Sequence, residues 1–362
     1  MGLPEITINF IQKAVSAITR SERSIACVII ADDTPKTAGY EIYKYEKDLP
    51  ETLYTAENLK ALKRCFLCNV NKLVVVHYMA TSGKFADALN ILENIKYNYV
   101  CAIQQDSQQD LVNYIISKDT NSKGKKYIAV VAGVTTADSK YIINVKNASV
   151  HDVDANETVP MVQYLPRLTS LLANLPMNRS CTYYILEDID LVDESFITVE
   201  KDINSWINSG WLVLFKDNDN IRIARGVNSL TTLTSTDSAD MKKIIIVESM
   251  NIILEDIYEE FKNDYVGHYK NYYDNQCLFI SAINSYFREL AKEEILDPDF
   301  ANISFIDVEA QRNAWLGIGK TAAEDWTEDK VKGMSFKSYI FLAGDIKILD
   351  AIEDLRFDIT ME

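Results

Sequence analysis

The sequence predicts an α/β region followed by a mixed α+β region, with one unpaired strand at each end of the chain. Its 362 residues exceed what one ordinary hydrophobic core accommodates, so two domains are expected. Between residues 24 and 133, short apolar runs alternate with helical patterns, which is typical of βαβ units in a mostly parallel sheet. At both termini, apolar and polar residues alternate with period two, and no partner strand lies next to them in sequence.

The terminal segments are the most informative feature. The apolar positions of these two arms are Ile6, Ile8 and Phe10 at the N-terminus and Leu355, Phe357, Ile359 and Met361 at the C-terminus. Burying four such side chains gains roughly 6–12 kcal/mol, whereas ordering seven residues of backbone costs about 7–14 kcal/mol. Because these sums nearly cancel, each arm needs the hydrogen bonds of an existing sheet edge. That edge belongs either to the same domain or to another molecule.

The first half of the chain predicts strands and helices in alternation. We expect strands at residues 24–30, 73–78, 97–103 and 126–132, and helices at 56–67, 85–95 and 111–116.

The second half is more varied. We expect a strand at 148–154, a helix at 159–175, a hairpin of strands 211–215 and 221–224, a strand at 243–247, long helices at 249–262 and 277–296, a helix at 306–316 and a strand at 338–342. These patterns divide the chain into an arm (1–20), an α/β domain (21–147), a mixed α+β domain (148–345) and a second arm (346–362).

Composition and charge exclude several classes of protein. A formal net charge of -16 and a pI near 4.7 argue against a nucleic-acid partner, which would need clustered lysine and arginine. No apolar run approaches the ~20 residues of a membrane span, and we expect no signal peptide, because the N-terminal residues lack a basic region followed by an apolar one. The six scattered cysteines suit reduced, buried thiols, so we expect folding in a cytoplasm.

Residues 314–321 contain the only approximation to a phosphate-binding loop. Gly319, Lys320 and Thr321 fit its second half, but Ala314 replaces the first glycine and Trp315 fills the loop. The preceding residues are polar and helical, whereas the motif requires a strand. We therefore predict no nucleotide cofactor.

The other candidate sites have similarly ordinary explanations. Cys65 and Cys68 form a lone C-x-x-C at a helix end, without the second pair that a zinc site needs. The histidines lack metal-ligand spacing, and the acidic clusters suit solvated faces in a chain this acidic. We predict no catalytic residues and no metal.

Several blocks in the second half occur together, in order, in one known family. They are residues 171–180, 225–232, 242–247, 264–267, 271–275, 282–287 and 346–354. In these blocks the chain resembles the contractile tail sheath proteins of bacteriophages and R-type bacteriocins. The region before residue 150 matches less clearly.

The resemblance implies a structural protein rather than an enzyme. Such a protein polymerises helically around a tail tube, in a metastable extended state, and contracts without ATP to drive the tube through a cell envelope. The N- and C-terminal arms would be exchanged, completing a small sheet in neighbouring copies. The mixed domain would lie at the inner radius and the α/β domain outside, with Arg312 and Trp315 as candidate tube contacts.

The implied partners are other copies of the chain, the tail tube protein, and the baseplate and tail terminator proteins, without nucleic acid or membrane insertion. The implied location is the bacterial cytoplasm during assembly, and then a virion tail or a released bacteriocin particle. An α/β enzyme acting on a small molecule is the alternative, followed by a monomeric adaptor.

Overall fold

The computed structural model describes residues 17–192 and 200–361, which group into two compact units. Residues 21–255 and 350–362 form the first, which we call the sheet unit. Residues 1–20 and 256–349 form the second, which we call the helical unit. The N-terminal positions Ile6, Ile8 and Phe10 lie outside the described residues.

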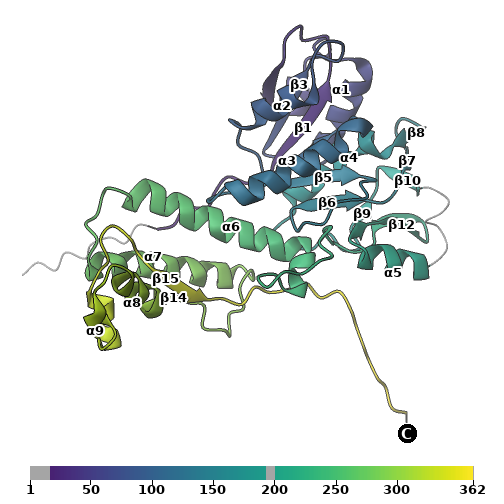
Figure 1. The fold of residues 1–362 in the computed structure, drawn as a ribbon. Helices are drawn as coiled ribbons and strands as arrows, with labels where there is room; N and C mark the ends of the chain where they lie inside the picture. The colour runs from purple at the N-terminus through teal and green to yellow at the C-terminus, as the bar shows by residue number, and fades with distance from the viewer. Residues whose placement is uncertain (1–16, 193–199, 362) are drawn as a thin grey trace, which may run out of the picture. The chain divides into compact units, whose positions relative to one another are not determined.

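A seven-stranded sheet forms the centre of the sheet unit (Figure 1). Its strands are β1 (Ile25–Ala31), β2 (Gly39–Tyr43), β3 (Lys72–Tyr78), β4 (Tyr99–Ala102), β5 (Ile128–Ala132), β6 (Ile142–Val145) and β11 (Trp211–Leu212), in the order β11-β6-β5-β4-β1-β3-β2. All neighbours are parallel except β2, which runs antiparallel to β3. The predicted parallel sheet is therefore confirmed, and the near-continuous apolar runs are its buried strands.

Helices cover this sheet. They are α1 (Ala56–Lys63), α2 (Phe85–Leu92), α3 (Gln108–Asn121), α4 (Met161–Asn174) and α5 (Glu200–Asn208). α4 packs on β1, β4 and β5, and only Gln163 and Asn174 in it are not buried. α2 packs on β3, and α3 packs on β4 and β5.

Two three-stranded antiparallel sheets complete the sheet unit. One has the order β10-β7-β8 and contains β7 (Ser149–Asp152), β8 (Glu157–Pro160) and β10 (Ile189–Val192). The other has the order β12-β13-β9 and contains β9 (Ile185–Leu186), β12 (Leu214–Asp217) and β13 (Asn220–Ile223). The predicted hairpin is confirmed as β12 and β13, and Asn218 has a φ of 54° in its turn.

The helical unit contains the end of α6 (Ile244–Glu260), a π-helical turn (Phe261–Tyr265), α7 (Tyr273–Lys292), β14 (Ile303–Ile306), α8 (Val308–Gly317), α9 (Glu328–Gly333) and β15 (Leu342–Asp345). β14 and β15 form a two-stranded antiparallel sheet. Within the described ranges, no helix combines the length and apolar character needed to cross a bilayer.

Two predicted strands differ from the structure. The strand at 243–247 is wrong, because α6 already begins at Ile244 and its first four residues are buried. A short, wholly apolar run does not distinguish a buried strand from a buried helix. The strand at 338–342 is displaced to Leu342–Asp345, because pairing with β14 selects residues of poor strand propensity, Gly344 among them.

Candidate functional site

The C-terminal segment combines an extended backbone with exposed apolar side chains. Residues 350–361 form neither helix nor strand, and Figure 1 draws them as a thread that ends at the C mark. Leu355, Phe357, Ile359 and Met361 are 89%, 75%, 70% and 91% exposed. Four large apolar side chains exposed along one short segment are unusual on the surface of a monomeric protein.

The root of this segment is fixed by a buried carboxylate. Glu353 is only 3% exposed at its side chain, and its Oε1 accepts hydrogen bonds from Ser180 Oγ at 3.1 Å and Thr182 Oγ1 at 2.5 Å. Its Oε2 lies 3.1 Å from Lys243 Nζ and 3.9 Å from Arg225 Nε. Two flanking ion pairs join Asp350 to Lys243 and Asp354 to Arg225.

The local chain geometry builds this arrangement. The Thr182 amide donates to Ser180 Oγ at 3.1 Å, and the Gly226 amide donates to Thr182 Oγ1 at 2.9 Å. A Cβ on Gly226 would lie 2.7 Å from Cys181 Sγ, so this close approach requires glycine. The sequence drew attention to residues 171–180 and 225–232, but not to their role.

The sheet of β14 and β15 has one occupied outer edge and one open edge. Asn284 on α7 accepts from the Ser304 amide at 2.6 Å and donates to the Ser304 carbonyl at 3.3 Å. Ser304 therefore directs its main-chain groups away from β15, and the opposite residue, Gly344, directs its groups away from β14. Gly344 is exposed, so among the residues that the structure describes β15 presents the open edge.

The two candidate tube-contact residues have partners within the helical unit. Arg312 Nη1 donates to the carbonyls of Ala323 at 2.6 Å and Trp326 at 2.8 Å. Trp315 Nε1 donates to the Met334 carbonyl at 2.9 Å, and its ring packs edge-on against Trp326 and Phe336. Both side chains thus hold α8 to the segment that follows it.

The sequence approximation to a phosphate loop occupies the wrong end of a helix. Residues 314–317 are the end of α8, and Gly319 follows with a φ of 87°. A phosphate loop precedes its helix, so that the helix N-terminus faces the anion. Here the Lys320 amide instead donates to the Trp315 carbonyl at 3.1 Å, as part of the helix end.

The cysteines of the C-x-x-C pair are free thiols, of which Cys65 is buried and Cys68 is half-buried. Burial raises the pKa of Cys65 to about 12, and Cys65 Sγ donates to the Pro166 carbonyl at 3.5 Å. Cys68 Sγ accepts from Arg167 Nη1 at 2.6 Å. Among the described residues, no group of three His, Cys, Asp or Glu side chains is placed to hold a metal ion.

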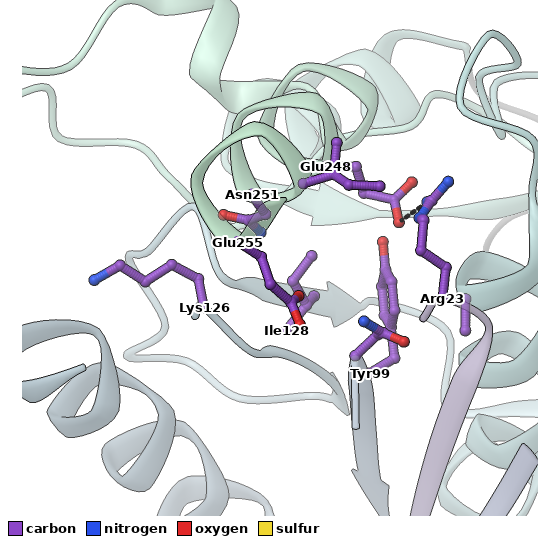
Figure 2. Close-up of a pocket in the computed structure, with 10 residues that line it drawn as sticks. Arg23, Tyr99, Lys126, Ile128, Glu248, Asn251 and Glu255 are labelled. Atoms are coloured by element: carbon purple, nitrogen blue, oxygen red, sulfur yellow. Dashed lines mark hydrogen bonds and ion pairs between the residues drawn. The ribbon is translucent and has the colours of Figure 1, made fainter. Parts of the chain in front are cut away.

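A small cavity in the sheet unit is the best-defined pocket beside α6. Figure 2 shows Glu248, Asn251 and Glu255 of α6 lining it with Tyr99 of β4 and Arg23. The Arg23 guanidinium donates to Glu248 at 3.0 Å, and burial raises the pKa of that carboxyl. The cavity measures about 30 Å³, the share of one water molecule rather than of a metabolite.

Comparisons with known proteins identify the family. Residues 79–229 match the phage tail sheath protein central domain, and residues 236–362 match the phage tail sheath C-terminal domain. The chain is 32% identical to the tail sheath protein of Clostridium phage phiCD119, over 99% of both sequences. The chain belongs to the phage tail sheath protein family.

Solved structures support the same fold for this sheath protein. It is similar to the helical sheath of the anti-feeding prophage in its contracted state, with a TM-score of 0.71, 11% identity and full coverage of both chains. It is also similar to the sheath tail protein of Listeria innocua, with a TM-score of 0.67, 12% identity and coverage of 92% and 97%. The contracted sheath of an extracellular contractile injection system matches with a TM-score of 0.66 and 12% identity over 100% and 98%.

Membership of this family makes the sheath protein a structural component rather than an enzyme. The alternative interpretation, an α/β enzyme acting on a small molecule, is therefore wrong.

Proposed function

We propose that this sheath protein polymerises helically around a tail tube and contracts to drive the tube through a target cell envelope. The observation that carries the proposal is the C-terminal arm: a segment whose apolar side chains are exposed while its root is fixed. A strand that costs as much to order as it gains by burial becomes stable when a neighbouring sheet supplies hydrogen bonds. The arm of each copy would thus add a strand to a sheet of the next copy.

The edge of β15 is the proposed receiving site for the arm. A two-stranded sheet is marginally stable by itself, and added strands would complete it. Because Asn284 already occupies the outer edge of β14, the incoming strand would pair with β15 at Leu342 and Gly344. Apolar side chains of the arm would then lie beside Ile303 and Phe305, which are 44% and 41% exposed on this sheet.

The N-terminal arm would extend the same sheet in a different neighbour, using Ile6, Ile8 and Phe10. Their period-two pattern supports this role. Two arms that reach different copies would join the subunits into a continuous mesh. An interface between unlike surfaces that does not close on itself generates a helix.

The tail tube, the baseplate and the tail terminator are the proposed partners. The mixed α+β region would face the tube and the α/β region would lie outside. Tube contact at Arg312 and Trp315 stays a proposal, and because both polar groups already have partners, the contact would use their remaining exposed surface. A small, polar contact would let the sheath release the tube on firing.

Contraction would use no nucleotide. The extended sheath would be kinetically trapped, and larger contacts between copies would lower the free energy of the contracted state. The protein would assemble in the bacterial cytoplasm and then form part of a phage tail or of a headless bacteriocin particle.

Electron microscopy of the purified protein tests the proposal. Tubes or contracted polysheaths are the expected result, whereas dispersed particles at every concentration and in the presence of tail tubes would contradict it. Cryo-electron microscopy of assembled tubes tests the receiving edge, because strand density beside β14 with none beside β15 would overturn that assignment.

A further inference from the structure

At the root of the arm, a charged side chain is buried and the neighbouring apolar side chains are exposed, which is the reverse of the usual pattern in a folded protein. Ile352 is 99% exposed and Leu355 is 89% exposed, whereas the charged side chain of Glu353 between them is 3% exposed. Hydrophobic burial therefore does not hold this part of the chain. The contacts that hold it are those to Glu353 and its acidic neighbours.

Four residues form what we call the carboxylate socket: Ser180, Thr182, Arg225 and Lys243. The two hydroxyls face Oε1 of Glu353, and the Lys243 and Arg225 cations lie 3.1 Å and 3.9 Å from Oε2, where they compensate the buried charge as ion pairs. The hydroxyls are held in place by backbone amides, since the Thr182 amide donates to Ser180 Oγ and the Gly226 amide donates to Thr182 Oγ1. The socket is thus a built site whose ligand is the chain's own Glu353.

The socket determines where the arm begins. Before it, the last fixed point is Leu349 in the helical unit, whose amide donates to the Ile295 carbonyl at 3.0 Å. With Glu353 bound, the free arm is residues 355–362. With Glu353 released, it is residues 350–362, and at about 3.3 Å per extended residue the reach grows by roughly 15 Å.

We propose that the carboxylate socket is a latch that sets the free length of the C-terminal arm. The latch rests on the proposed function in one respect, namely that the arm engages a neighbouring copy. A closed latch keeps the arm short and raises its effective concentration at a neighbour's edge. A closed latch also transmits mechanical force on the arm to the sheet unit. With the latch open, the same force would act on the segment that follows β15.

A protease that cleaves after glutamate measures, in the monomer, how often Glu353 leaves the socket. Cleavage after Glu353 releases residues 354–362, which mass spectrometry quantifies. We expect slow release from the wild type and release at least about tenfold faster from both socket variants. Thr182→Val removes a hydrogen bond to Glu353, and Lys243→Met removes the ion pairs to Glu353 and Asp350. Lys242→Met is the matched control, because it removes the same charge from the adjacent residue, which lies outside the socket.

Equal release from the wild type and both socket variants would overturn the latch. Thermal melts of all four proteins show whether faster release comes from global unfolding. Thr182→Val alone decides the question if Lys243→Met is unfolded, and release from Thr182→Val at the wild-type rate then overturns the latch.

Assembly separates the latch from the proposed function. Socket variants that still polymerise should need a severalfold higher protein concentration than the wild type and Lys242→Met, because a longer free arm lowers the effective concentration. If protection of Glu353 is lost in the variants but their assembly is unchanged, arm exchange is wrong and the latch stands. If neither release nor assembly changes, the latch is wrong.

Discussion

The ammonium group of Lys243 lies 3.1 Å from the Glu353 carboxylate, although the two residues are 110 positions apart along the sequence. Burial alone would lower the pKa of Lys243, but hydrogen bonds to Asp350 and Glu353 reverse that effect and raise it. The lysine therefore stays charged through the neutral range, and so does its attraction for the root of the arm. The pair links the start of α6 to the segment that carries the exposed apolar row.

Deleting residues 355–362 should leave a soluble, folded monomer that does not polymerise. The apolar side chains removed are 70–91% exposed, so the free energy of unfolding should change by less than about 0.5 kcal/mol. Circular dichroism melts and electron microscopy measure the two properties. Normal tubes from the truncated chain would show that the arm does not connect the copies.

Phe357→Asp should block assembly, and Phe357→Leu should not. A carboxylate at this position would be buried without a partner in the receiving sheet, at a cost of about 2–7 kcal/mol. The polymerisation threshold should therefore rise by at least about thirtyfold. The monomer should keep its stability, because Phe357 is 75% exposed. Equal assembly of both variants would mean that the other face of the arm is buried.

Asn284→Ala should destabilise the small sheet of the helical unit. It removes the partner of both main-chain groups of Ser304, at a cost of about 1–3 kcal/mol. Chemical denaturation measures the loss, and Asn263→Ala, at an exposed position, should change stability by less than about 0.5 kcal/mol. An unchanged Asn284→Ala would show that α7 does not secure this edge.

Asp237 should contribute stability that acid removes. The Lys140 ammonium at 2.7 Å and the Thr234 hydroxyl lower the pKa of Asp237 from 3.8 to about 2. Because the folded pKa is below the unfolded value, the contribution is complete above about pH 4 and is lost as pH falls toward 2. Asp237→Asn should cost about 1–2 kcal/mol at pH 7 and progressively less toward pH 2. A cost that does not depend on pH would contradict the assignment; Asp219→Asn, in an exposed turn, is the control.

Lys320→Ala should leave triggered contraction intact. Lys320 lies in the turn that follows α8, and its amide donates to the Trp315 carbonyl, so the residue is placed after a long helix rather than before one as in a phosphate loop. Purified wild-type protein should hydrolyse no ATP. Turnover that disappears in Lys320→Ala would contradict this and the nucleotide-free mechanism.

The sequence was most informative where local pattern and burial agree. The buried runs of β1, β3, β4 and β5 are continuous and apolar, and the helices between them are regular, so the parallel sheet could be predicted. β2 was missed because it is a short edge strand, in which Tyr40 and Ile42 are about half exposed and carry no clear alternation of burial.

The carboxylate socket could not be predicted for a different reason. Glu353 bonds to Ser180 across 173 positions and to Thr182 across 171, and neither distance leaves a periodic trace in the sequence. A buried glutamate in an acidic stretch also has the same appearance as its exposed neighbours. Only the folded chain distinguishes Glu353 from Asp354, which is 80% exposed at its side chain.

The hydrogen bonds of Asn284 give any polymer of this chain a direction. With β14 covered, the proposed receiving edge for each C-terminal arm is β15 of another copy, so copies that join head to tail build a polymer with a direction. The two ends of a growing sheath are then chemically different: one displays unfilled β15 edges and the other displays unused arms. The proteins that start and finish the sheath therefore need opposite chemistries, since one must supply a strand and the other must supply an edge.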